Sequence, residues 1–342
     1  MKKSLQTLLL AAGVSLFSLP AVAWHVSEEQ SLKEILFEEF TGPNCTSCPA
    51  GTELLKTIAD SYPERFHLVS YHVEGYTSEG IYNYRTVEGD EIYSALNDKI
   101  FSIPSGWVNR HQFEHRTYKC LQSTYWENDV ALEAALPASV NLWMRAVYDE
   151  SERMVTVDVE GYFLENLDLN SPRLMVAVTQ NGIIGRQAGA KEPNNYEHNH
   201  MNRAFVTSVW GEELDIVPSK GKHFRWTAEY ELPESVGPVE IVPENLEFVA
   251  FLAESEEEVI NSTSCYLSSP EEWQDDPNDN YDEDEENEDP GTTGVYGISP
   301  ELPASLEIFT VNGNRVSSSN VNDLPKGLYI LREGGKSVKI IR

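Results

Sequence analysis

The sequence predicts an α/β domain, followed by an all-β domain and a small C-terminal β module. Three patterns predict this order. A short apolar run over residues 35–40 is followed by a turn, two cysteines and a helical pattern of apolar residues. Later segments alternate β-branched and polar residues, as strands do. Residues 293–342 contain further strand-like runs, two of which meet at Asn312-Gly313, a strong hairpin signal.

The two cysteines of the α/β part, Cys45 and Cys48, stand between the predicted strand and the predicted helix. A thiolate at a helix N-terminus is stabilised by the helix dipole and by unpaired N–H groups, which lower its pKa from about 8.5 to roughly 3.5–7.5. The two intervening residues allow the sulfurs to meet and close a disulfide. The order of elements therefore indicates a dithiol redox site.

Two other interpretations of this pair must be compared with the redox site. Half of a zinc site has the same form, but zinc requires a second Cys or His pair, and Cys120 and Cys265 stand singly and far away. A static disulfide that pins the turn is also compatible with the residues, because an extracellular protein keeps such a bond indefinitely.

The surroundings of the pair resemble the thioredoxin superfamily. Glu39 stands six residues before Cys45 at the buried end of the first strand, and Pro104 follows an isoleucine just before another strand. The resemblance implies a thioredoxin-like domain over residues 24–135. It also implies that Cys45 is the attacking thiol, Cys48 the resolving thiol, Glu39 a buried proton carrier and Pro104 a cis-proline.

This sequence departs from the superfamily pattern in two places. Asn44 stands where an aromatic residue is usual. The distance along the chain from Cys48 to Pro104 is also longer than in a plain thioredoxin, so residues 75–100 are predicted to be an insertion that contains a helical piece from Asp90.

The first residues predict export. A charged start, an apolar stretch over residues 8–19 and the small residues 21–23 have the form of a secretory signal peptide, assigned to residues 1–23. Cysteine is absent after the predicted cleavage site, so a lipid anchor there is not expected. No later stretch is long and apolar enough for a transmembrane helix, so none is predicted after cleavage.

The charge of the chain excludes some classes of partner. A formal net charge of −31 repels nucleic acid and anionic membrane surfaces, so neither is expected to bind. Twelve of the acidic residues lie within residues 271–289. Because such a run cannot bury a core, residues 269–292 are predicted to be an acidic, disordered linker.

Residues 136–268 are predicted to form a β-sandwich, because turn residues separate their strand-like runs at short intervals. The predicted strands cover residues 154–162, 173–179, 223–230 and 246–253.

Four further residues could form sites in or beside this sandwich. His198 and His200 are two apart, so on one strand they would share a face and could both bind a metal ion. Because no third ligand is evident, a structural or interface pair of histidines is the simpler interpretation, and no cofactor is predicted. Cys120 and Cys265 each lie near the end of a predicted domain. They could form a disulfide that clasps the two domains, or remain free thiols.

The C-terminal module resembles the sorting domain of the type IX secretion system of Bacteroidota. The resemblance is carried by residues 311–316, by residues 324–332 and by the basic end at 339–342. It implies that the type IX machinery is a partner, that the chain crosses the outer membrane, and that the tail of residues 293–342 is removed on anchoring or release.

Three motifs resemble the Bacteroidota family of 28-kDa-type outer membrane proteins: residues 38–51, 103–110 and 196–203. The resemblance covers about residues 30–268. It implies a thioredoxin-like domain paired with an Ig-like β-sandwich, at the outer membrane or cell surface or in secreted form.

Two functions are compatible with these features. The first is a thiol–disulfide oxidoreductase that acts through a mixed disulfide between a substrate and Cys45. The second is a non-enzymatic adhesin or ligand-binding protein that binds an unknown protein or surface ligand. Under this second hypothesis the Cys45–Cys48 disulfide is structural.

Overall fold

The computed structural model describes residues 24–78, 80–96, 102–255 and 257–273, together with the strand segments 307–310, 315–316, 328–333 and 336–341. The predicted signal peptide, residues 274–292 of the predicted acidic linker and Asn312-Gly313 lie outside the described residues. The prediction of disorder is wrong for the start of that linker, because Pro270–Trp273 forms a 3-10 helix and the Trp273 ring packs against Trp143.

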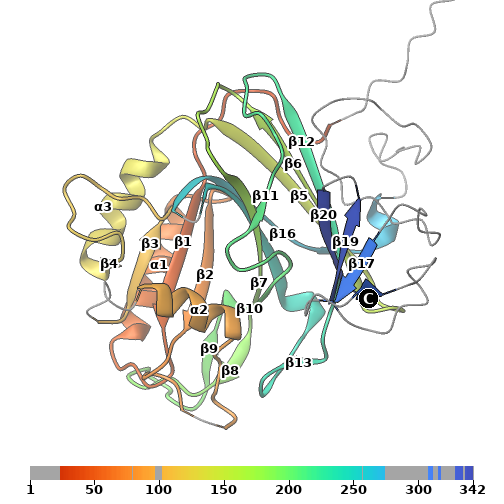
Figure 1. The fold of residues 1–342 in the computed structure, drawn as a ribbon. Helices are drawn as coiled ribbons and strands as arrows, with labels where there is room; N and C mark the ends of the chain where they lie inside the picture. The colour runs from red at the N-terminus through yellow and green to blue at the C-terminus, as the bar shows by residue number, and fades with distance from the viewer. Residues whose placement is uncertain are drawn as a thin grey trace, which may run out of the picture.

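Three α-helices and twenty strands make up the described chain (Figure 1). The helices are α1 (Cys48–Ser61), α2 (Val87–Leu96) and α3 (Ser123–Ala134). The first strands are β1 (Ile35–Thr41), β2 (Phe66–His72), β3 (Ser105–Val108), β4 (Leu121–Gln122), β5 (Val140–Asp149), β6 (Met154–Phe163), β7 (Pro172–Gln180), β8 (Ile183–Gly185), β9 (Tyr196–His198) and β10 (Met201–Phe205). The remaining strands are β11 (Glu212–Glu213), β12 (His223–Glu231), β13 (Ser235–Val236), β14 (Val239–Glu240), β15 (Leu246–Glu254), β16 (Glu258–Ser268), β17 (Glu307–Thr310), β18 (Arg315–Val316), β19 (Leu328–Glu333) and β20 (Lys336–Ile341).

One twelve-stranded sheet organises the main body, in the order β12-β6-β5-β16-β15-β7-β10-β2-β1-β3-β4, with β11 beside β7. β1 pairs in parallel with β2 and antiparallel with β3. β10 links the two predicted domains, because it pairs with β7 on one side and with β2 at Met201–Ser70 on the other. The sheet therefore continues across the boundary predicted at residues 135–136.

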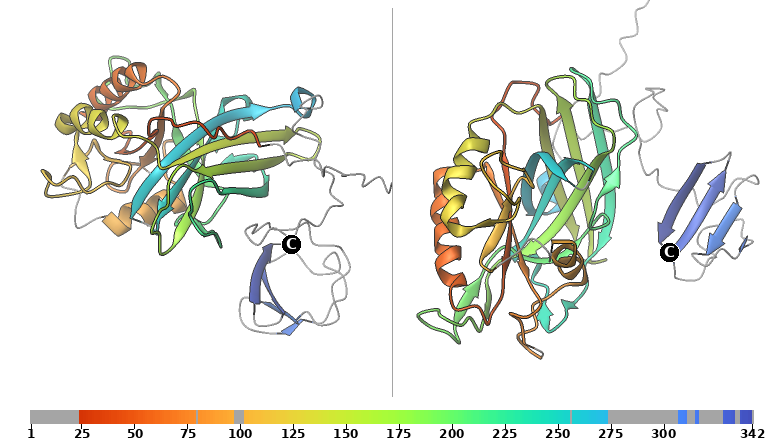
Figure 2. Two further views of the ribbon diagram at one scale, coloured as in Figure 1. Left: turned by 90° about the horizontal axis from the view of Figure 1, so that it is seen from above. Right: turned by 60° about the vertical axis from the view of Figure 1, so that its left-hand side comes forward.

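The sheet folds over itself, so that helices and strands form layers with a core between each pair (Figure 2). The helix-side core lies between α1 and α3 and one face of β1–β3; it includes Ile35, Phe37, Leu55 and Trp126. The middle core lies between the other face of β1–β3 and β7 and β15; it includes Leu36, Val69, Met175 and Phe251. The far core lies between β7 and β15 and the layer of β5, β6 and β12; it includes Val157, Val176, Phe224 and Phe248.

Strands β7 and β15 are buried on both faces because they separate two cores. In β15, Phe248 and Ala250 belong to the far core, whereas Val249 and Phe251 belong to the middle core. Every residue of β15 except its last is buried. This double burial explains the nearly continuous apolar run in the sequence, since a strand covered on both sides needs no polar face.

The predicted elements and the structure agree in large part. The strands expected in the α/β part and the four expected in the β part are present, with shifts of a residue or two at their ends. The helix expected after the cysteines is α1, whose buried residues Cys48, Gly51, Leu55 and Ile58 recur at helical spacing. The strands β5, β8–β10 and β16 were not predicted. The fold is a mixed α/β arrangement built on a large sheet.

The described strands of the C-terminal segment form a separate antiparallel sheet in the order β18-β17-β19-β20. β17 pairs with β18 at Ile308–Val316, as the hairpin prediction requires, and with β19 from Glu307–Arg332 to Thr310–Tyr329.

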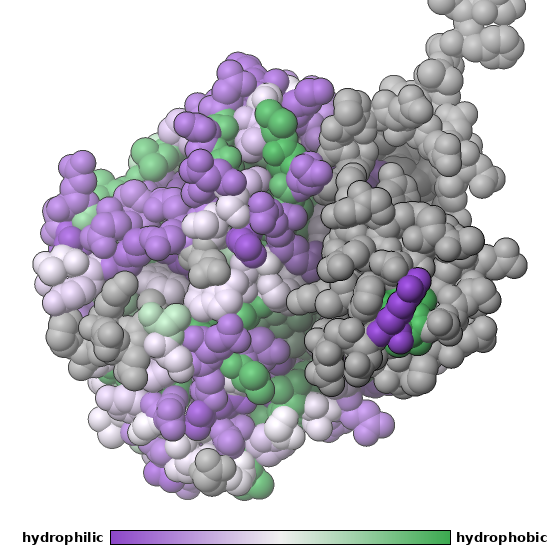
Figure 3. All heavy atoms as spheres, viewed as in Figure 1, coloured by the Kyte–Doolittle hydropathy of each residue, from purple (hydrophilic) through white to green (hydrophobic). Residues whose placement is uncertain are grey.

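The surface of the main body is largely polar on the face that Figure 3 shows, with hydrophobic side chains scattered among polar ones. In the described part of the chain, no helix combines the length and apolar character needed to cross a bilayer.

Candidate active site

Cys45 and Cys48 form a disulfide at the start of α1. Cys45 lies in the turn after β1, Cys48 is the first residue of the helix, and their Cα atoms are 5.5 Å apart. Cys45 is 3% exposed and Cys48 1%, so the bond is covered in this structure. The helix N-terminus at Cys48 provides the electrostatic setting that stabilises a thiolate when the bond is reduced.

The segment around Pro104 lies against the disulfide. The Ile103–Pro104 peptide bond is cis, as the resemblance implies. The Ile103 carbonyl oxygen is 3.8 Å from Cys45 Sγ and accepts a hydrogen bond from Ser47 Oγ at 3.4 Å. A Cβ atom at Gly51, in the first turn of α1, would lie 2.8 Å from Pro104 Cγ. Glycine at this position therefore allows the helix to approach the proline ring.

Glu39 lies on the face of β1 that looks toward the helices, together with Ile35 and Phe37. Ser70 Oγ, on the neighbouring strand β2, donates a hydrogen bond of 2.7 Å to Glu39 Oε2. The other oxygen, Oε1, is buried without a partner among the described residues. Burial raises the pKa of Glu39 from 4.5 to about 7, against the opposing effects of the Ser70 hydrogen bond and the charge of His200. The carboxyl can therefore exchange a proton near neutral pH.

Tyr196, on β9, lies near both Glu39 and helix α1. Burial raises the pKa of Tyr196, a hydrogen bond with Thr52 of α1 lowers it, and the charges of Glu39 and Glu53 raise it further. The phenol therefore lies within electrostatic range of Glu39 and in contact with α1. The sequence carried no signal for this role, because Tyr196 comes from β9, far along the chain.

The loop between β8 and β9 lies against the turn that carries Cys45. Gln187 Nε2 donates hydrogen bonds to the carbonyl oxygens of Cys45, at 2.8 Å, and Gly42, at 3.2 Å. The Ala188 amide donates to the Pro43 carbonyl at 2.7 Å. These contacts were not predicted, because the loop is separated from the cysteines by more than a hundred residues.

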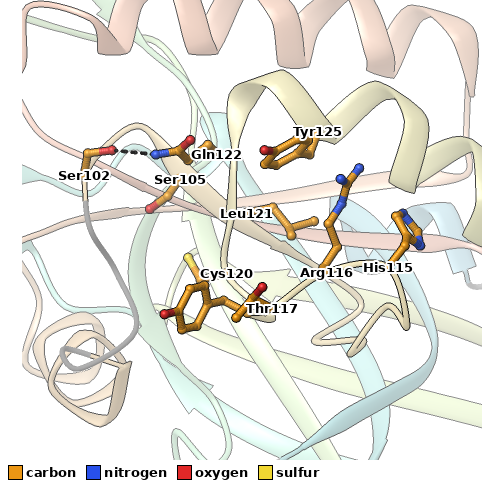
Figure 4. A pocket seen from close by; sticks show the side chains of 10 residues that line it. Ser102, Ser105, His115, Arg116, Thr117, Cys120, Leu121, Gln122 and Tyr125 are labelled. Atoms are coloured by element: carbon orange, nitrogen blue, oxygen red, sulfur yellow. Dashed lines mark hydrogen bonds between the residues drawn. The ribbon is translucent and has the colours of Figure 1, made fainter.

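A cavity of about 300 Å³ opens beside Ser102 and Ser105, which flank the Pro104 segment. Ser102, Ser105, Cys120 and Tyr125 are among the residues that line it (Figure 4). Arg116 also lines it, with its guanidinium carbon 3.9 Å from the centre of the Tyr125 ring. Burial raises the pKa of the Cys120 thiol to about 12, so this thiol is protonated at neutral pH and is a poor nucleophile.

The predicted clasp between Cys120 and Cys265 is not formed, and both residues are free thiols. The physical reason is the layering of the sheet. Cys120 packs against the middle core, whereas Cys265, on β16, packs against the far core. The two side chains therefore face different sides of the central strand layer.

The prediction that His198 and His200 share one face of a strand is wrong, because β9 ends at His198 and His200 lies in the turn before β10 with φ +52°. The His198 ring packs edge-on against His72, with 5.2 Å between ring centres, and burial lowers its pKa to about 4. The His200 Nδ1 atom lies 3.1 Å from Glu247 Oε2. Among the described residues, three or more His, Cys, Asp or Glu side chains nowhere gather in a metal-binding group.

A buried ion pair in the middle core was also missed. Arg110 Nε and Nη2 donate to the two carboxylate oxygens of Glu38 at 2.6 and 2.7 Å. The Tyr71 hydroxyl donates to the same carboxylate at 3.0 Å. The adjacent acidic residues of the sequence gave a partial signal, because neighbours on a strand must point to opposite faces.

Comparison with known proteins gives one family and several related folds. Residues 94–269 match the family described as outer membrane protein Omp28. The match includes Pro104 and the loop containing Gln187, but not Cys45 or Cys48. No curated protein matches the chain.

Among solved structures, HBP35 of Porphyromonas gingivalis is similar over 91% of this chain and 98% of its own, with 18% identity and a TM-score of 0.57. A domain of the outer membrane lipoprotein Omp28 from the same organism is similar over 39% of this chain and 90% of its own, with 20% identity and a TM-score of 0.27. At this identity, the likeness to HBP35 concerns the fold.

The family match spans slightly more than half of the 342 residues. It agrees with the outer-membrane or cell-surface location that the sequence predicted. The chain belongs to the Omp28 family of outer membrane proteins.

Proposed function

We propose that this protein is a thiol–disulfide oxidoreductase of the outer membrane or cell surface, with Cys45 and Cys48 as its redox-active pair. One observation carries the proposal: the disulfide lies at the start of α1, beside the Ile103 carbonyl that precedes Pro104. Glu39, with a pKa raised to about 7 by burial, supplies a proton carrier on the helix-facing side of β1.

The exchange reaction proceeds in two steps that balance. A substrate thiolate attacks the Cys45 sulfur, a mixed disulfide forms, and Cys48 leaves as a thiolate that accepts a proton, for which Glu39 is the proposed donor. A second substrate thiolate then attacks the substrate sulfur of the mixed disulfide and releases Cys45. Two electrons pass from the substrate to the protein, and the substrate leaves as a disulfide. In the reverse direction, Cys45 attacks a substrate disulfide and Cys48 resolves the intermediate.

The finer architecture belongs to the same proposal. We assign residues 24–135 to a thioredoxin-like domain with an insertion at about 75–100, and residues 136–268 to an Ig-like sandwich. The parallel pairing of β1 with β2 and the two helices on one face of β1–β3 support the first assignment. The far core between two strand layers supports the second.

The route to the surface is also a proposal. Residues 1–23 act as a signal peptide, residues 269–292 as an acidic linker, and residues 293–342 as a sorting domain for the type IX machinery. The four-stranded sheet β18-β17-β19-β20 supports the last assignment, because it is separate from the main sheet and agrees with a distinct C-terminal β module.

The reduction potential of the Cys45–Cys48 pair tests the proposed chemistry. Equilibration of the mature protein with glutathione, followed by mass measurement of the alkylated thiols, gives this value. A potential of about −120 to −270 mV lies in the range of known oxidoreductases, whereas a value below about −300 mV indicates a structural bridge and contradicts the proposal.

Variants of the two cysteines provide a second test. Cys45→Ala is expected to abolish exchange with a model disulfide, and Cys48→Ala is expected to trap a mixed disulfide. Cys120→Ala is the matched control, because its buried thiol has a raised pKa and lies outside the pair. Wild-type exchange by both active-site variants would rule out catalysis by this pair.

Burial of the disulfide favours a second candidate function. Cys45 is 3% exposed and Cys48 1%, and such burial is also typical of a structural disulfide. In that case the protein is a non-enzymatic adhesin or ligand-binding protein of the surface. Alanine at either cysteine would then lower the melting temperature and leave ligand binding intact.

A further inference from the structure

The loop of residues 186–195 joins β8 to β9, which pair with each other and form a two-stranded sheet outside the main sheet. Gln187 is the only buried side chain in this loop, with 2% exposure. Its amide group points at backbone carbonyls of the Cys45 turn rather than at other residues of the main cores. The loop is therefore attached to the disulfide region by a few polar contacts.

Three contacts hold this loop over the turn of residues 42–46. The Gln187 side chain binds the carbonyl oxygens of Gly42 and Cys45, and the Ala188 amide binds the Pro43 carbonyl. Gly189 then passes so close that a Cβ atom there would lie 2.0 Å from the Thr46 carbonyl oxygen. Gly189 also has φ +78°, a backbone conformation that favours glycine. Glycine is therefore favoured at this position both by the close contact and by the backbone conformation.

The loop therefore lies against the backbone of the turn that carries Cys45, while the two cysteine side chains pack with the middle core. We propose that residues 186–190 form a cap over the Cys45–Cys48 disulfide, and that thiols reach Cys45 only after this cap opens. The inference concerns the access of reactants to the disulfide, so it goes beyond the proposed function. It holds whether or not the protein catalyses disulfide exchange. Gln187 and Gly189 thereby decide which thiols can react.

Opening of the cap costs little in buried apolar surface. Gly189 and residues 191–195 are exposed. Segments with few buried apolar contacts open locally at lower free energy than the cores do. The base of the loop is held more firmly, because His198 Nε2 lies 3.2 Å from the carbonyl oxygen of Arg186, the first loop residue, and the His198 ring packs on His72 and Tyr84. When the cap opens, we therefore expect residues 187–190 to move while Arg186 stays in place beside these aromatic rings.

The test is the rate at which a phosphine reductant reduces the disulfide in the full mature protein. The reaction is stoichiometric: the phosphine supplies two electrons and becomes a phosphine oxide, water supplies its oxygen and two protons, and the protein gains two thiols. Alkylation and intact mass give the reduced fraction over time. Two variants open the cap by different means. Gln187→Glu sets a carboxylate against two carbonyl oxygens, and Gly189→Ala sets a methyl group against the Thr46 carbonyl.

Both variants are expected to increase the rate by about tenfold or more, which corresponds to the loss of one or two hydrogen bonds. Asn194→Ala is the matched control, because Asn194 is exposed in the same loop and makes none of the three contacts. It is expected to be reduced at the wild-type rate. Wild-type rates for both cap variants, with melting temperatures unchanged, would overturn the proposal.

Hydrogen exchange of the wild-type protein gives a reading that needs no variant. The Ala188 amide is expected to be protected from exchange by its hydrogen bond to the Pro43 carbonyl. The fraction of open molecules calculated from its protection should agree with the fraction that limits the rate of reduction. An unprotected Ala188 amide would contradict the cap even if a variant failed to fold. Faster reduction of the cap variants without catalytic exchange by the wild type would uphold the cap and refute only the proposed enzyme.

Discussion

The two neighbouring carboxylates of β1, on opposite faces of the strand, have different hydrogen-bond partners. Glu38 faces the middle core and is fully buried, yet Arg110 and Tyr71 hydrogen-bond both of its oxygens. Arg110 is in turn surrounded by aromatic rings, with the centres of the Trp107 and Phe251 rings 5.3 Å from its guanidinium carbon. Glu39 faces the helices and receives one hydrogen bond, from Ser70, while its other oxygen has no partner among the described residues.

The difference separates a carboxylate that holds the layers together from one that can exchange a proton. A paired, hydrogen-bonded charge is costly to disturb, because removal of its partner leaves an uncompensated charge in the interior. A buried carboxyl without a cation directly bound to it prefers the neutral form, which raises its pKa. The four predictions that follow test this contrast.

The largest effect is expected for Arg110→Met, which keeps the length of the side chain and removes its charge. It leaves Glu38 buried with the Tyr71 hydroxyl, so the free energy of unfolding should fall by about 3–5 kcal/mol. Urea denaturation at pH 7 measures this. The control is Arg85→Met, whose pair with Asp90 is partly exposed and is worth about 1 kcal/mol or less. Equal losses for the two variants would mean that the Glu38 pair is not structural.

Glu39→Gln is expected to make the protein more stable at high pH than the wild type. Below about pH 4.5 the carboxyl is protonated in both states. As the pH rises from about 4.5 through about 7, the unfolded chain ionises while the folded protein keeps its proton, so wild-type stability falls. At about 1.4 kcal/mol per pKa unit, the fall amounts to roughly 3 kcal/mol.

The amide variant lacks this fall, so its advantage over the wild type should appear at pH 8 and vanish at pH 4. Urea denaturation at the two pH values measures the difference. The control is Glu197→Gln on the exposed side of β9, which is expected to change the unfolding free energy little. An advantage that does not depend on pH would show that Glu39 has the same pKa in the folded and unfolded states.

A smaller effect is expected for Ser70→Ala, which removes the hydrogen bond to Glu39 Oε2. This bond favours the ionised form, so its loss should raise the pKa of Glu39 above about 7, by about one unit for a hydrogen bond to a charged group. Carbon-13 NMR of the Glu39 carboxyl group measures the shift directly. A pKa that stays near 7 would mean that burial alone sets it.

The smallest effect is expected for His200→Asn. Asparagine tolerates the left-handed backbone at this position, where φ is +52°, so the turn should be preserved. The charge of His200 lowers the pKa of Glu39, and its removal should raise that pKa by less than Ser70→Ala does. The same NMR titration compares the two variants. A larger shift for His200→Asn would make His200 the main partner of Glu39.

The sequence predicted the local parts of the candidate site better than the distant ones. Cys45, Cys48 and Glu39 lie within ten residues of one another, so the strand, turn and helix that position them are visible in one short stretch. Pro104 was found through the resemblance to a known superfamily. Gln187 and Tyr196 were missed, because a glutamine or a tyrosine in a loop has no pattern that indicates which distant backbone it will contact.

The same limit applies to the fold. Strands such as β6 and β12 alternate in the sequence because one of their faces packs in the far core while the other carries polar residues. β5 was not recognised, although it pairs with β6 along its whole length from Val140–Phe163 to Asp149–Met154. The pairing of β10 with β2 rests on one short contact, which no periodicity predicts. That contact nevertheless joins the two halves of the sheet.

The position of β7 and β15 between two cores has a consequence for how the protein unfolds. Each strand supplies alternate residues to the middle core and the far core, so neither core can lose these strands without exposing the other. Although the chain resembles two domains joined end to end, we expect residues 24–273 to melt in a single cooperative transition. A destabilising substitution in the layer of β5, β6 and β12 would then lower the stability of the whole body, including the disulfide region, without a local change in the chemistry of the disulfide.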